Sequence, residues 1–159
     1  MNLKFQHHFD AAHRLERYVG KCANIHGHRW TVQIELLGCK QGSQDGMVVD
    51  FTIVKRELKK ICEVFDHKLV MENPPKSLCE YTACVATGYN PTAENLAIDF
   101  AVQLGWILRS LGVNFCNITA TVYETPTNCA SHDLYLEQIP EPFMDAIDRA
   151  KFVREVDWL

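Results

Sequence analysis

The sequence predicts an α+β domain in which an antiparallel sheet carries two helices on one of its faces. Apolar and polar residues alternate with the period of a half-buried strand in four segments, residues 3–9, 30–37, 117–123 and 133–138. Between the second and third segments, residues 53–65 and 93–111 carry apolar side chains at the spacing of a helical stripe. The predicted order is therefore two strands, two helices and two strands.

The first two strands are predicted from rows of apolar side chains that share one face, because side chains alternate between faces along a strand. In the first strand the odd-numbered residues 3–11 form this row, and His13 ends it. In the second strand the even-numbered residues 30–36 form the row, and His26 and His28 lead directly into it.

The two helices have local start and stop signals. Residues 53–65 place apolar side chains at spacings of four, three and four residues. Before residues 93–111, Thr92 is suited to be the N-cap, and Glu94 favours the positive end of the helix dipole. Gly112 stands where helices commonly end.

The remaining segments lack such periodicity. Residues 40–50 predict a turn and another short strand, since glycine and aspartate interrupt the pattern there. Residues 71–89 predict a long irregular insertion. Residues 139–159 predict a C-terminal tail that contains a short amphipathic helix from Phe143 onward. We expect residues 1–159 to form a single domain.

Composition excludes several classes of protein. The chain has 159 residues, with 47% hydrophobic and 23% charged residues, as is usual for a globular domain. A net charge of −4 without a basic stripe argues against nucleic-acid binding. No apolar run suits a membrane span, and the N-terminus lacks a signal-peptide pattern. We expect a cytoplasmic protein whose seven cysteines are reduced thiols.

Three histidines and a cysteine are the most informative residues of the chain. On a strand, His26 and His28 lie on one face with Cα atoms roughly 6–7 Å apart, close enough to bind one ion. His13 supplies a third imidazole, and three imidazoles from two strand ends suit a zinc site with one open position. Cys22 would either complete a closed structural site or remain an unligated base or nucleophile, and the spacing does not decide between these.

Five motifs follow one another along the chain. They are F-D-A-A-H-R-L at residues 9–15 with C-A-N-I-H-G-H at 22–28, G-M-V-V-D-F at 46–51, F-D-H-K-L at 65–69, N-P-T-A-E-N at 90–95 and V-Y-E-T-P-T at 122–127. Together they resemble the 6-pyruvoyltetrahydropterin synthase and 6-carboxytetrahydropterin synthase superfamily. The resemblance extends over about residues 3–137. H-G-H alone is a weak signal, whereas five motifs in the right order are a strong one.

The resemblance implies a fold, an assembly and a reaction. The fold is the tunnelling fold, whose sheets join edge to edge into a barrel formed by several subunits, with trimers stacked into homohexamers. The enzyme is a zinc-dependent lyase that acts on 7,8-dihydroneopterin triphosphate, with zinc as the Lewis acid. One branch forms 6-pyruvoyltetrahydropterin. The other also loses acetaldehyde and forms 6-carboxytetrahydropterin, on the route to 7-deazaguanines such as queuosine. Three residues separate Cys22 from His26, which resembles the carboxy branch, and we therefore favour that product.

The resemblance also implies catalytic roles. Cys22 would be the general base beside zinc held by His13, His26 and His28, and a neighbouring dication lowers the pKa of a thiol. Asp66 and His67 would form a second acid–base unit. A direct hydrogen bond between these consecutive residues requires a bend in the backbone. The structural alternative is that Asp66 caps a turn and His67 is a surface residue.

Three further residues resemble those that bind the pterin. Glu124 would anchor the ring by accepting two hydrogen bonds from its amino group and adjacent N–H, or would act in the proton relay. Thr92 and Glu94 would line the same pocket. Their structural alternative is a helix cap with a first-turn acid, and both roles are compatible.

The chain departs from the family pattern at Trp30, where a smaller aromatic residue is usual, and in residues 71–89, which are longer than usual. Both departures bear on the identity of the product more than on metal binding. A competing hypothesis is a non-enzymatic zinc module in which Cys22 is the fourth ligand.

Overall fold

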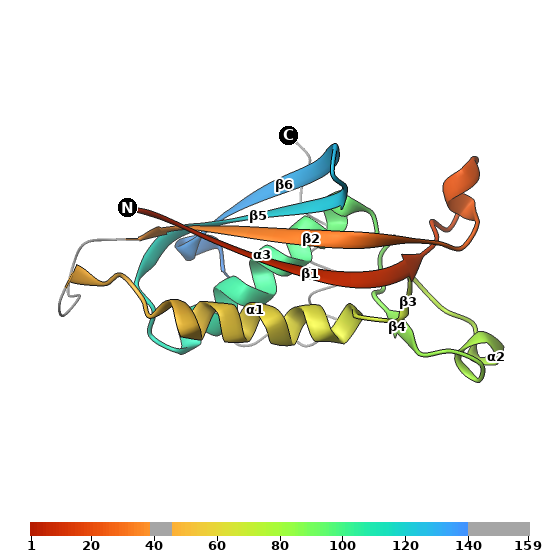
Figure 1. Cartoon of the computed structure of the whole chain (residues 1–159), viewed down its shortest axis with the longest axis horizontal. Coiled ribbons are helices and arrows are strands. Elements are labelled where there is room, and N and C mark those ends of the chain that lie inside the picture. The colour runs from red at the N-terminus through yellow and green to blue at the C-terminus, as the bar shows by residue number, and fades with distance from the viewer. Residues whose placement is uncertain (39–45, 140–159) are drawn as a thin grey trace.

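The computed structural model describes residues 1–38 and 46–139 of the chain. Among them, the strands form one six-stranded sheet in the order β4-β3-β1-β2-β5-β6 (Figure 1). The strands are β1 (Asn2–His13), β2 (His26–Gly38), β3 (Leu69–Met71), β4 (Cys84–Ala86), β5 (Phe115–Thr125) and β6 (Asn128–Tyr135). The helices are α1 (Phe51–Phe65), α2 (Lys76–Cys79) and α3 (Ala93–Ser110), and Lys21–Ala23 and Leu136–Gln138 form single 3₁₀ turns.

The centre of the sheet is the long antiparallel pair of β1 and β2. Its register places Phe5 opposite Ile34, Ala11 opposite His28, and His13 opposite His26. The last residues of β1 therefore lie against the first residues of β2. Strand β5 continues the sheet beyond β2, and β6 pairs with β5 as an antiparallel hairpin.

Helices α1 and α3 lie side by side on one face of the sheet (Figure 1). The side chain of Asp50 accepts a hydrogen bond from the backbone N–H of Thr52 at the start of α1, and the Thr92 side chain accepts one from Asn95 at the start of α3. The predicted apolar rows face these helices and form one core; its fully buried members include Trp30, Val32, Ile34 and Leu36 from β2, Phe100 and Leu104 from α3, and Ile118 and Val122 from β5. The α+β class, with two helices on one face, is confirmed.

The sheet is mixed, which corrects the prediction of an antiparallel one. Strand β3 pairs in parallel with the end of β1, where Ala12 lies opposite Leu69 and His13 opposite Val70. Strand β4 pairs in parallel with β3. Both strands are three residues long, and such short strands depend on pairing with distant residues rather than on a local pattern. Part of the segment predicted as an irregular insertion, residues 71–89, is therefore ordered as α2 and β4.

Several predicted boundaries also differ. Strand β6 begins at Asn128 and ends at Tyr135, earlier at both ends than the predicted 133–138. Residues 46–50 contain no strand, and the rest of the predicted turn and strand at 40–50 lies outside the described residues, as does nearly all of the predicted tail. Cys116 is disulfide-bonded, so the expectation that all cysteines are reduced is wrong. No helix in residues 1–38 and 46–139 is long and apolar enough to cross a membrane.

Candidate metal centre and active site

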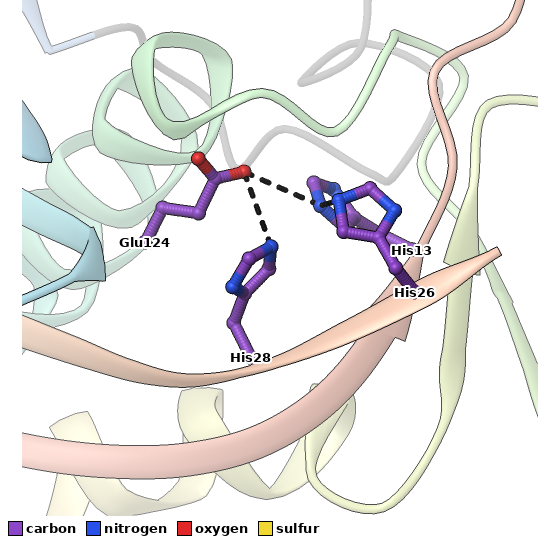
Figure 2. Close-up of side chains that lie close together, drawn as sticks. All are labelled: His13, His26, His28 and Glu124. Carbon is purple, nitrogen blue, oxygen red and sulfur yellow. Dashed lines mark hydrogen bonds and ion pairs between the residues drawn. The ribbon is translucent and has the colours of Figure 1, made fainter. Parts of the chain in front are cut away.

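Three histidines and one glutamate converge at one end of the sheet (Figure 2). His13 ends β1, and the register with β2 places it opposite His26. His28 lies two residues further along β2 and so has the same face as His26. Glu124 follows Tyr123, which pairs with Thr31 of β2. Each of the four side chains offers one ligand atom, and these atoms all lie within 4.8 Å of one another.

Three distances within the cluster involve the ring Nε2 atoms and the carboxylate. His13 Nε2 lies 3.1 Å from His26 Nε2 and 3.3 Å from Glu124 Oε1. His28 Nε2 lies 3.6 Å from the same carboxylate oxygen. In Figure 2 the Glu124 carboxylate points toward His13 and His28. Ligands held at 2.0–2.1 Å around a tetrahedral zinc lie about 3.3–3.4 Å from one another, so these distances match the edges of such a site.

The opposite ring nitrogens fix the tautomers of two histidines. His13 Nδ1 lies 2.8 Å from the carbonyl oxygen of Pro91, and His26 Nδ1 lies 2.9 Å from the carbonyl oxygen of Asn24. A carbonyl oxygen can only accept, so both Nδ1 atoms carry a proton and, in the neutral rings, both Nε2 atoms present lone pairs. Two lone pairs 3.1 Å apart repel each other unless a proton or a metal cation lies between them.

Burial of the histidines disfavours a proton between the two Nε2 atoms. The side chain of His13 is 1% exposed, and this burial lowers its pKa, although the hydrogen bond to Pro91 and the charge of Glu124 act in the opposite direction. Burial also lowers the pKa of His28, partly offset by Glu124. Both rings are therefore neutral at neutral pH, which is the form that binds a metal.

An unsatisfied buried atom supports the same conclusion. His28 Nε2 is buried and has no hydrogen-bond partner, although buried polar atoms nearly always have one. It points into the cluster, where a metal ion would use its lone pair. Three imidazoles and one carboxylate are a donor set typical of zinc. The residues present therefore fit a zinc ion.

Asp66 and His67 form a hydrogen-bonded pair after α1. His67 Nδ1 lies 2.9 Å from Asp66 Oδ2, and Asp66 Oδ1 accepts a hydrogen bond from the backbone N–H of Asp10. His67 has a left-handed backbone with φ of 57°, which supplies the bend that this contact requires. The hydrogen bonds from Asp10 and His67 lower the pKa of Asp66. An ionised carboxylate therefore orients an exposed imidazole.

Two cavities adjoin the cluster. One, of about 600 Å³, is lined by both His28 and His67. The other, of about 570 Å³, is lined by His28, Glu124 and polar residues of the uncovered sheet face. The imidazole of the Asp66–His67 pair and a member of the cluster thus face one shared space.

The other predicted site residues lie as follows. Cys22 is half-buried in the turn between β1 and β2, and its carbonyl oxygen accepts a hydrogen bond from the backbone N–H of Leu15. It is not a member of the cluster of possible metal ligands found among the described residues. Thr92 caps α3 and Glu94 lies in its first turn; neither is among the residues that line the two cavities.

Two features of the site were not predicted from the sequence. The first is that Glu124 lies within hydrogen-bonding distance of a histidine of the cluster. Its position at a strand end was visible in the sequence, but the register between β2 and β5 was not. The second is the hydrogen bond between His13 and Pro91. The Pro91 backbone carbonyl makes it, so the residue type gives no indication of it.

Comparison with known proteins is consistent with this geometry. The sequence profile of the 6-pyruvoyl tetrahydropterin synthase family matches residues 2–134. The 6-carboxy-5,6,7,8-tetrahydropterin synthase of Rickettsia felis is 36% identical over 128 residues, which cover 76% of this chain and 91% of that protein. A putative 6-carboxy-5,6,7,8-tetrahydropterin synthase of Pyrococcus horikoshii is 39% identical over 146 residues, which cover 81% of this chain and 87% of that protein.

Solved structures show the same fold. A catalytic-residue mutant of Plasmodium vivax 6-pyruvoyltetrahydropterin synthase superimposes with a TM-score of 0.69 at 23% identity, covering 85% of this chain and 98% of that one. The 6-pyruvoyl tetrahydropterin synthase of Caenorhabditis elegans gives a TM-score of 0.61 at 26% identity, covering 83% and 94% of the two chains. The cluster of His13, His26, His28 and Glu124 is consistent with the metal site of this family.

Proposed function

The chain belongs to the 6-pyruvoyl tetrahydropterin synthase family, and on this premise we propose that it is a zinc-dependent 6-carboxy-5,6,7,8-tetrahydropterin synthase. The reaction would convert 7,8-dihydroneopterin triphosphate into 6-carboxy-5,6,7,8-tetrahydropterin, with loss of acetaldehyde and triphosphate, in 7-deazaguanine and queuosine biosynthesis. The observation that carries the proposal is the cluster of three imidazoles and a carboxylate beside two cavities. The names of the curated relatives and the three-residue spacing between Cys22 and His26 support the carboxy product.

His13, His26 and His28 would hold the zinc, and Glu124 is placed to be the fourth ligand. When bound, zinc would supply Lewis-acid stabilisation to oxygen atoms of the substrate. The hydrogen bonds from His13 to Pro91 and from His26 to Asn24 orient two of the rings, a role that outer groups commonly have at zinc sites. If Glu124 takes the fourth position around zinc, Cys22 is not needed as a ligand, and this argues against the closed structural site.

Cys22 would be the general base. It lies in the connection that leaves the cluster at His13 and returns to it at His26, and its carbonyl is hydrogen-bonded to Leu15, two residues after His13. A thiolate at this place would remove a proton from the substrate.

His67 would return the proton. Asp66 holds the His67 ring at Nδ1, so Nε2 is the nitrogen that exchanges a proton with the substrate in the cavity shared with His28. The two hydrogen bonds between Asp10 and residues 66–67 attach this pair to β1, the strand that carries His13.

Glu124 would have two roles in turn. Its carboxylate faces His13 and His28, and it lines the second cavity. From there the same carboxylate would accept hydrogen bonds from the pterin or relay a proton. Thr92 and Glu94, at the start of α3, would contribute to pterin binding.

The alternative is 6-pyruvoyltetrahydropterin synthase activity, because solved structures with that name share the fold. We also propose a homo-oligomer, with the open edges of β4 and β6 as the subunit contacts. Such an assembly, a trimer or hexamer, would place each active site near a subunit boundary.

The decisive experiment is incubation with 7,8-dihydroneopterin triphosphate and identification of the products by mass spectrometry. The proposal expects 6-carboxytetrahydropterin and acetaldehyde, and 6-pyruvoyltetrahydropterin would identify the alternative. His26→Ala is expected to lose both zinc and turnover. Failure of the zinc-loaded wild type to consume the substrate would refute both enzymatic functions.

A further inference from the structure

Two segments that are far apart in the sequence meet beside the cluster. Residues 13–16 begin at the last residue of β1, and residues 90–91 precede α3. Three hydrogen bonds join them. One runs from His13 Nδ1 to the Pro91 carbonyl oxygen, and the other two are made by the side chain of Asn90.

The Asn90 side chain pairs with the backbone of Glu16 in both directions. Its Oδ1 accepts a hydrogen bond from the Glu16 N–H at 2.7 Å, and its Nδ2 donates to the Glu16 carbonyl oxygen at 2.8 Å. The amide thus forms the two bonds that a neighbouring strand would form with the same residue. Both distances are short for N–H···O bonds, and they fix the separation of the two segments.

The backbone of Asn90 is held equally firmly on its other side. Its carbonyl oxygen accepts hydrogen bonds from the N–H of Thr92 at 2.8 Å and from Asn95 Nδ2 at 2.9 Å. The next residue is Pro91, whose ring fixes φ and restricts the conformation of the residue before it. The direction of the Pro91 carbonyl is therefore set by the start of α3, and its distance from β1 is set by the Asn90 side chain.

We propose that Asn90 is a positioning residue of the metal site, which holds the Pro91 carbonyl against His13 and so keeps the lone pair of His13 on Nε2, toward the cluster. Asn90 is not a member of the cluster and acts through Pro91 and His13. His13 is the most deeply placed of the three histidines, since its side chain is 1% exposed and that of His28 is 20% exposed. Water therefore has little access to replace a carbonyl that moves away from Nδ1.

The proposal rests on the proposed zinc site and predicts a defined effect on metal affinity. Loss of an outer hydrogen bond to a metal-binding histidine typically lowers metal affinity 10–100-fold. We expect Asn90→Ala to lower the affinity for zinc and cobalt by that factor. The visible spectrum of bound Co²⁺ is expected to shift, because the His13 ring is no longer held in one orientation.

The matched control is Glu16→Ala. The Glu16 side chain accepts a hydrogen bond from the N–H of Asn73 at 3.0 Å, so this variant loosens the same loop. It leaves both backbone bonds to Asn90 in place. A purely structural role of the loop would lower metal affinity similarly in the two variants, whereas the proposal expects Glu16→Ala to remain within about threefold of wild type.

The test is a competitive titration of the metal-free full-length protein with Zn²⁺ and Co²⁺, with thermal unfolding of each metal-free variant measured in parallel. If Asn90→Ala does not fold, Asn90→Gln carries the test, because its longer amide cannot keep both Glu16 bonds at their present lengths without moving the backbone. Wild-type affinity and an unchanged Co²⁺ spectrum in the folded Asn90 variant would overturn the inference while the proposed function stands. A wild-type protein that binds neither metal would overturn the proposed function first.

Discussion

Replacing His28 with phenylalanine should change stability in opposite directions with and without zinc. His28 Nε2 is buried and has no hydrogen-bond partner among the protein groups. An unsatisfied buried polar atom destabilises a protein by about 1–3 kcal/mol, and the 20% exposure of the side chain favours the lower end. His28→Phe should therefore raise the free energy of unfolding of the metal-free protein by about 1 kcal/mol, which is about 2–4 °C in Tm for a chain of this size.

With zinc bound, wild type should be more stable than His28→Phe. Ligand binding at 100 times Kd stabilises a folded protein by about 2.7 kcal/mol, or roughly 5–11 °C on the same scale. Wild type gains this stabilisation, and His28→Phe loses most of it with one of its metal ligands. The assay is thermal unfolding at neutral pH with a chelator and with zinc buffered at fixed free concentrations.

A second histidine provides the control. His132 is partly buried in β6 and is outside the cluster of possible metal ligands, so the effect of His132→Phe should be the same with and without zinc. The reasoning would be refuted if His28→Phe kept the full zinc-dependent rise in Tm. It would also be refuted if the metal-free variant were less stable than wild type.

Four further outcomes are expected. Cys22→Ala should keep zinc and the fold but lower turnover by about 10²–10⁴-fold, and release of zinc, measured by metal analysis, would instead identify Cys22 as a ligand. Glu124→Gln should weaken binding of a pterin by about 10–100-fold, as loss of a charge-assisted hydrogen bond of roughly 1.5–3 kcal/mol implies; calorimetry that finds equal affinity would exclude the anchoring role. Asp66 has a lowered pKa in the folded protein. Its contribution to stability is therefore present above the ordinary Asp pKa of about 3.9 and is lost as pH falls through the folded value. Asp66→Asn should make the free energy of unfolding, measured with denaturant, depend less steeply on pH in this acid range, and an unchanged slope would contradict the hydrogen bonds assigned to Asp66. Sedimentation equilibrium should find a homo-oligomer, most simply a hexamer, and a stable, active monomer of 18.2 kDa would contradict the predicted assembly.

The sequence predicted the elements whose burial pattern is local. The odd-numbered row of β1 and the even-numbered row of β2 follow from alternation alone, and the helical stripe before Phe65 follows from its spacing. Strand β6 was predicted to begin five residues late, because residues 128–132 are partly or fully exposed and show no apolar alternation. Its start is set by the turn after β5.

The sequence predicted the features of the site that depend on the alternation of side chains along one strand. It did not predict those that depend on the register between two strands. That His26 and His28 share a face follows from their spacing, and the same rule placed His13 at the end of the apolar row of its own strand. The position of Glu124 depends on the register of β2 with β5, in which Thr31 lies opposite Tyr123. Register is a property of two distant segments together, so the sequence indicated a carboxylate at a strand end but not its neighbours.

The cluster lies across a gradient of burial, and this gradient indicates which ligand a substrate would displace. His13 is 1% exposed and is held by Pro91, whereas Glu124 is 29% exposed and lines a cavity of about 570 Å³. A substrate that enters this cavity meets the carboxylate before the deeper histidines.

If Glu124 is the fourth zinc ligand in the resting protein, pterin binding and zinc ligation compete for one carboxylate. Glu124→Gln should then lower zinc affinity in the absence of pterin, because a neutral amide oxygen binds zinc more weakly than a carboxylate does. With a pterin bound, zinc affinity should differ less between the variant and wild type. An equal loss of zinc affinity in both conditions would show that Glu124 stays on the metal throughout, and no loss in either would restrict it to the pterin.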